Sequence, residues 1–219
     1  MLYIYMLPAA FLAPIIHEWV KALCSTLLGD PTPKRTGHLT LNPLKYFEPI
    51  GFLFVLTFGF GWANPVPTAA LHYKNRNLGT ILTYTAPIFV NLLLGIASVV
   101  GVMALGTRGN VMVNAGLMFR IITEFHFIVT DVNMIGIILL SHFAFININI
   151  ALFNLIPIYP LAANKLMIVF SSPDTIARLN HNEKMMQIIL IVLLAINVIG
   201  RVFGPVAARI VILTWGIFA

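Results

Sequence analysis

Charged residues are scarce in this chain, and this scarcity indicates its class. Asp, Glu, Lys and Arg make up 9% of its 219 residues, hydrophobic residues make up 59%, and the mean hydropathy is +0.94. In soluble domains about a quarter of the residues are charged, so this composition excludes a soluble domain and predicts an integral membrane protein in contact with the lipid bilayer. The net charge of +6 reflects only 7 acidic residues rather than a clustered basic face, so nucleic acid is not an expected partner.

Cysteine and targeting signals are also nearly absent. Cys24 is the only cysteine, which rules out an internal disulfide and predicts a small core residue at that position. The first apolar stretch starts at Leu2 with no basic region before it. We therefore expect no cleavable signal peptide and a first helix that is retained.

Long apolar runs predict the helices that cross the membrane, because about 20 helical residues span the hydrocarbon layer. Three ranges meet this length, namely 2–28, 79–105 and 133–157. The remaining apolar ranges are less regular. Residues 50–63 are few enough to form a re-entrant segment, residues 106–132 are typical of an interfacial amphipathic helix, and residues 185–219 form either one long helix broken at Gly204-Pro205 or a tight hairpin.

The polar stretch 29–49 sets the predicted orientation. It carries Lys34, Arg35 and Lys45, and because basic residues favour the cytoplasmic side, the N-terminus is predicted to lie outside. Within this stretch the His-Leu-Thr-Leu alternation at 38–41 has period two, which is typical of a strand. The predicted fold class is an all-α polytopic membrane protein with one short β-like re-entrant loop.

A polar patch is predicted inside the first helix. His17, Glu18 and Lys21 lie within five residues, and helical spacing brings all three onto one stripe. His-Glu is the first half of H-E-x-x-H, in which two histidines bind zinc and the glutamate is the general base. The second histidine position holds Lys21, whose ammonium has no lone pair for a metal. Ionisable groups in a membrane helix are costly unless they face a protein interior, so this patch is the candidate functional site.

Several stretches of the chain share their pattern with one known family. They are HEWVK at 17–21, GDPTPKRTGHLTLNPLKYFEPIG at 29–51, FGWANPVP at 60–67, TAPIFVNLLLG at 85–95 and FNLIPIYPLAANKL at 153–166. In this order they resemble the bacterial and archaeal site-2 protease family, which are zinc metalloproteases that cut substrates within the membrane. The resemblance implies a site-2-protease-like transmembrane core at 1–168, a cytoplasmic connection and C-terminal transmembrane segment at 169–219, and a prokaryotic plasma membrane.

The resemblance also implies where catalytic residues would stand. The first zinc-binding histidine corresponds to His17 and the general base to Glu18, whereas the second histidine is replaced by Lys21 and the aspartate ligand by Ala162. A catalytic zinc normally has three protein ligands and a water. With two ligands replaced we expect no bound zinc, an idle Glu18 and no hydrolysis. Lys21 then either forms an ion pair with Glu18 in place of the metal or snorkels to the headgroups.

The predicted function is that of a catalytically inactive homologue that keeps the membrane fold and binds a single-span membrane protein. By resemblance, the partner would lie between the first helix, the strand-like loop and the helix of Asn91, against His38, Leu39, Thr40, Leu41, Asn42, Asn91 and Asn154. Two alternatives stay open. One is an active zinc-dependent intramembrane endopeptidase with an unusual ligand set that would draw on Asn154, Asn164 and Glu18. The other is a small transporter or channel subunit, with Glu18 and Lys21 along a polar path.

Overall fold

The computed structural model describes residues 3–40, 42–109, 113–123 and 132–218, and all regular structure in these ranges is helical. The α-helices are α1 (Tyr3–Leu27), α2 (Thr32–Arg35), α3 (Pro49–Phe58), α4 (Arg76–Arg108), α5 (Ala115–Thr123), α6 (Val132–Phe153), α7 (Ala162–Val169), α8 (Pro173–His181), α9 (Glu183–Ala195) and α10 (Val198–Phe218); two short 3-10 helices are η1 (Pro43–Lys45) and η2 (Ala70–His72). Among the described residues, four helices are long and apolar enough to cross a membrane: α1, α4, α6 and α10. The prediction of an all-helical, multi-pass protein is confirmed as far as the helical content and the number of candidate membrane-spanning helices are concerned.

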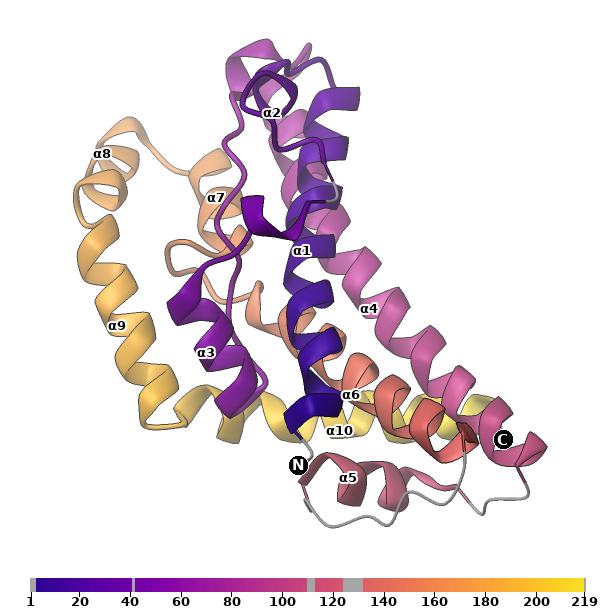
Figure 1. The fold of residues 1–219 in the computed structure, drawn as a ribbon. Coiled ribbons are helices and arrows are strands. Elements are labelled where there is room, and N and C mark those ends of the chain that lie inside the picture. The colour runs from indigo at the N-terminus through magenta and orange to yellow at the C-terminus, as the bar shows by residue number, and fades with distance from the viewer. Residues whose placement is uncertain (1–2, 41, 110–112, 124–131, 219) are drawn as a thin grey trace.

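The centre of the fold is formed by α1, α4 and α6, which pack against one another (Figure 1). The inner residues of α6, including Ile146, Ile148 and Ile150, are buried. At the crossing of α4 and α6, a Cβ on Gly95 would lie 2.5 Å from the Cγ1 atom of Ile148. A small residue at this position therefore lets the two helices approach closely, as is common in membrane proteins. The polar groups of α1 that face this centre lie inside protein.

The apolar range 50–63 divides into a short helix and an irregular connection. α3 has 10 residues and ends at Gly59, which has a left-handed φ of 75°. A helix of this length reaches about 15 Å, half of a membrane. Residues 60–69 then continue as irregular chain, and this connection carries Val66 to the polar patch of α1.

The strand expected at 38–41 is wrong for the part of this segment that the structure describes. Residues 38–40 and Asn42 lie in bends and irregular chain, and Leu41 lies outside the described residues. The cause is local, because the Tyr46 hydroxyl donates hydrogen bonds to the backbone carbonyls of His38 and Thr40. A strand also needs a neighbouring strand with which to form a ladder, and the described residues contain none.

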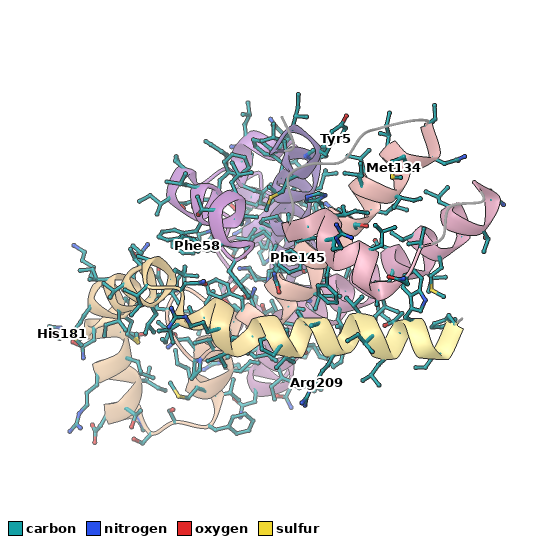
Figure 2. The ribbon with its side chains drawn as sticks, turned by 90° about the horizontal axis from the view of Figure 1, so that it is seen from below. Tyr5, Phe58, Met134, Phe145, His181 and Arg209 are labelled. Carbon is teal, nitrogen blue, oxygen red and sulfur yellow. The ribbon has the colours of Figure 1, made fainter. Side chains whose placement is uncertain are left out.

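The tail is divided at Asn197 and not at Gly204-Pro205. Asn197 has a φ of 55° between α9 and α10, a left-handed conformation that Asn adopts more readily than most residues. Pro205 lies inside α10. Figure 1 shows α10 running across the end of the bundle opposite α2 and α8, and in Figure 2, which is seen from below, the helix that carries Arg209 lies in the foreground. The tail therefore forms a corner rather than a tight hairpin.

The range 106–132, expected to be an interfacial helix, is described only in part. α5 buries Met118 and Ile121 against other helices, so its apolar side packs on protein. Residues 124–131, including His126, lie outside the described residues.

Candidate functional site

Three ionisable side chains of α1 lie together in the interior. His17, Glu18 and Lys21 are 4%, 7% and 4% exposed, because their stripe of α1 faces the other central helices and the connection after α3. An unpaired charge at this depth would cost several kcal/mol. The partners of these three groups therefore define what the site can do.

Both oxygens of the Glu18 carboxylate are occupied. The Nζ atom of Lys21 lies 2.7 Å from Oε1 and 2.5 Å from Oε2. The backbone N–H of Val66 donates a hydrogen bond of 2.7 Å to Oε2. Charge-assisted bonds of this kind balance the carboxylate within the protein, and they tie the irregular connection to α1.

The orientation of His17 is fixed by a chain of hydrogen bonds that crosses three helices. The side-chain amide of Asn147 on α6 donates to the carbonyl of Phe143, so its oxygen faces the Asn91 amide nitrogen at 2.8 Å. Asn91 also donates to the carbonyl of Ala13, which leaves its own oxygen 2.8 Å from Nδ1 of His17. Nδ1 must therefore carry the proton, and the lone pair of the neutral ring is on Nε2.

Lys21 ends inside the protein, so the snorkelling alternative is wrong. Its ammonium lies 5.5 Å from the centre of the Tyr84 ring, within cation–π range. The Tyr84 hydroxyl lies 3.0 Å from Oγ1 of Thr68. Lys21 lines a cavity of about 340 Å³ that also borders Lys165 and Glu183. Glu18 does not line this cavity.

The space on the other side of the ion pair is small. A pocket of about 20 Å³ lies against His17 and Glu18, which is room for about one water. Asn154 and Leu161 line it as well. The Asn154 side-chain oxygen accepts a hydrogen bond from the N–H of Ala162 at 3.2 Å, so the end of α6 holds the start of α7 beside α1. The fold thus brings together the segments that carry the predicted positions 17, 18, 154 and 162.

The donor atoms at the site do not fit a catalytic zinc. Within the ranges that the structure describes, no three His, Cys, Asp or Glu side chains are close enough to hold a metal ion. His17 offers one nitrogen, the Glu18 oxygens are bound, and Ala162 contributes a methyl group. Three protein ligands are normally required, and a dication here would be repelled by the ammonium of Lys21.

The residues predicted to bind a partner fall into two sets. Asn91 and Asn154 are buried, and their side chains are committed to internal hydrogen bonds. The second set is the segment 38–42, in which His38, Leu39 and Thr40 are half-buried, Asn42 is exposed and Leu41 is outside the described residues. Burial, followed by the nearby charge of Lys45, lowers the pKa of His38. The accessible part of the predicted surface is this second set.

A second buried carboxylate, Asp30, anchors the end of the same connection. It accepts hydrogen bonds from the Ser25 hydroxyl at 2.8 Å and from the backbone N–H groups of Thr32 and Ala69 at 2.9 and 2.7 Å. Burial opposes ionisation, but these hydrogen bonds prevail and hold the pKa of Asp30 below its usual value. Asp30 thus fixes the connection at Ala69 as Glu18 fixes it at Val66.

Three groups at the site were missed by sequence reasoning. Asn147 could have been found, because two asparagines in the apolar run FININI at 145–150 indicate hydrogen bonds between helices. Val66 acts through its backbone N–H, which the residue type does not reveal. Tyr84 acts through its ring face, and aromatic residues are too common in membrane helices to identify it.

A known protein is similar to this chain over most of its length. It is the Bacillus subtilis (strain 168) protein named "Putative zinc metalloprotease YwhC", which is 28% identical over 193 residues, covering 87% of this chain and 80% of the relative. No protein-family model matches the sequence, and no solved structure matches it significantly. The described part of the chain therefore has four helices long and apolar enough to cross a membrane and a buried Lys21–Glu18 ion pair, and the chain is similar to a protein named "Putative zinc metalloprotease YwhC".

Proposed function

We propose that this protein has a site-2-protease-like core, does not hydrolyse peptide bonds, and acts by binding a single-span membrane protein. One observation carries the proposal: the Glu18 carboxylate is bound by the Lys21 ammonium and the Val66 N–H. A general base must reach the proton that it removes, and this carboxylate is already bonded at both oxygens. The similarity to the protein named "Putative zinc metalloprotease YwhC" supports descent from such an enzyme.

The name of that relative also favours a second candidate, an active zinc-dependent intramembrane endopeptidase. This activity would require three protein ligands and a bound water. The zinc content of the purified protein separates the two candidates. We expect no stoichiometric zinc in the detergent-purified wild type by elemental analysis and no cleavage of a transmembrane peptide.

The matched control restores the missing donors. The variant Lys21→His/Ala162→Asp is expected to gain zinc relative to the wild type, whereas Lys21→His alone adds only a second imidazole and should gain less. One zinc per chain in the wild type, or cleavage that Glu18→Gln abolishes, would overturn the proposal in favour of the enzyme.

The partner surface that we propose is formed by residues 38–40, Asn42 and Leu44, of which Leu44 is 78% exposed. A photo-crosslinking residue at Leu44 should capture a transmembrane protein in native membranes, and substitutions at Leu39 and Thr40 should reduce that capture. A crosslinker at Leu71, which is 71% exposed on η2, is the matched control. This surface would be wrong if the crosslinkers at Leu44 and Leu71 captured the same proteins, or if the substitutions at Leu39 and Thr40 left the amount captured unchanged.

A further inference from the structure

A polar cavity lies where α4 begins. It measures about 440 Å³ and is bordered by the first turns of α4, by α7 and by α8. Figure 1 places these elements at the end of the molecule opposite the N-terminus and α10. The cavity shares Thr68, Tyr84 and Lys165 with the cavity beside Lys21, but Glu18 and His17 do not line it. It therefore adjoins the cavity beside Lys21 but does not extend to the pocket against His17 and Glu18.

The lining of this cavity is positively charged. Arg76 and Lys165 border it, and none of the described residues in its lining carries a carboxylate. Arg76 is exposed and forms no ion pair within the described part of the chain. Lys165 lies 3.5 Å from Oε1 of Glu183, with side chains that are 32% and 34% exposed. Its ammonium also lies 5.7 Å from the centre of the Tyr159 ring. Such partly exposed contacts are weak, so both cations are available to a ligand.

Neutral polar groups complete the lining. The Asn180 amide on α8 supplies a donor, whereas the Thr80 and Ser171 hydroxyls already donate to the backbone carbonyls of Arg76 and Met167. The cavity also borders the start of α4, where the helix dipole favours negative charge. A guanidinium, an ammonium and a side-chain amide that border one cavity are groups that recognise phosphoryl oxygens.

We propose that this cavity binds a phosphoryl group. Its volume lies within the usual range of ligand pockets, about 300 to 1,000 Å³, so it accommodates the phosphate together with the group that it esterifies. The long apolar helix α4 starts at Arg76, which puts the cavity at the level where Lys and Arg meet lipid headgroups. The phosphoryl group belongs either to an anionic phospholipid or to a free phosphate compound.

The lipid source is tested by native mass spectrometry of the full chain with equal amounts of phosphatidylglycerol and phosphatidylcholine. We expect preferential retention of phosphatidylglycerol, weakened about thirtyfold in Arg76→Ala/Lys165→Met, because each of these two cations borders the cavity and its contact with the phosphoryl group contributes about a fivefold factor. Lys74→Met is the control, since Lys74 is exposed and absent from the lining. Its retention should equal that of the wild type.

A variant that should increase lipid binding distinguishes a binding role of Lys165 from a structural one. Glu183→Gln releases Lys165 from its ion pair, so it should increase the retention of phosphatidylglycerol up to about fivefold, whereas a merely structural role would give no gain. In the second arm, inorganic phosphate is titrated against the thermal stability of the lipid-free protein. If phosphate stabilises the wild type but not the double variant, and neither lipid is preferred, the ligand is the free phosphate compound. Equal binding in wild type and double variant in both arms, or no binding in either, would overturn the proposal.

Discussion

Replacing Lys21 with Met would remove the ammonium that balances Glu18 while keeping a flexible side chain of similar length. The wild-type ammonium lies 2.7 and 2.5 Å from the two carboxylate oxygens, and the two side chains are 6% and 10% exposed. In the variant, the carboxylate would keep the Val66 N–H at 2.7 Å but would lose its counter-charge. Lys21→Met should therefore destabilise the protein strongly.

The size of the effect follows from burial. Removing one partner of a buried ion pair costs about 3 to 5 kcal/mol, because the other charge is left unpaired in a poorly solvated place. For a chain of this length, 1 kcal/mol corresponds to about 2 to 4 °C in the melting temperature, so the expected drop is about 6 to 20 °C. The double variant Glu18→Gln/Lys21→Met removes both charges, and its Gln oxygen can still accept the Val66 N–H. It should recover most of the loss.

The assay is thermal unfolding in one detergent at one concentration, followed by circular dichroism. Wild type, both single variants and the double variant form a thermodynamic cycle whose coupling energy measures the ion pair. Lys74→Met, which removes an exposed lysine, should leave the melting temperature within about 2 °C. A Lys21→Met melting temperature equal to or above that of the wild type would refute the counter-charge role of Lys21.

Three further predictions concern the groups around the ion pair. The pKa of Asp30 is lowered in the folded protein, so its carboxylate stabilises the fold at pH values above its unfolded pKa of about 3.9. The stability of the wild type should therefore fall as the pH drops below about 4. Asp30→Asn should be less stable than the wild type at pH 7, and its melting temperature should depend less on pH when melts are recorded across this range. Asn91→Leu leaves Nδ1 of His17 unpaired and should cost about 1 to 3 kcal/mol in chemical unfolding. In Gly51→Ala the new Cβ would overlap a backbone carbonyl of the connection after α3, so it should lower the melting temperature by several degrees, whereas Gly204→Ala meets no atom within 4 Å and should not.

The parts of the fold that composition and helix spacing determine could be predicted from the sequence. Apolar runs located α1, α4 and α6, because length and hydropathy suffice to define a membrane helix. The period-two pattern at 38–41 predicted a strand wrongly, because a strand needs a second strand to pair with and the pattern of one segment does not show whether one is present. The break in the tail was misplaced because Pro205 is tolerated within α10, while the turn occurs at Asn197.

At the site, the contacts within one helix could be predicted and those between distant segments could not. The spacing of Glu18 and Lys21 places them side by side on any helix, and they are bonded in the structure. The link from His17 through Asn91 to Asn147 depends on how three helices pack. Val66 depends on the path of irregular chain, which residue types alone do not encode.

If positions 21 and 162 correspond to zinc ligands of the resembled family, as we propose, charge arithmetic accounts for the two differing together. A zinc dication with two neutral imidazoles, the glutamate and an aspartate sums to zero formal charge. Lys21, Glu18, neutral His17 and Ala162 also sum to zero. Histidine in place of Lys21 alone would leave the Glu18 carboxylate without a counter-charge when no metal is bound. Aspartate in place of Ala162 alone would bury a second anion with Lys21 as the only cation of the set. Each intermediate is costly at this depth. On the proposed correspondence, the two positions are coupled through charge, although one lies on α1 and the other begins α7.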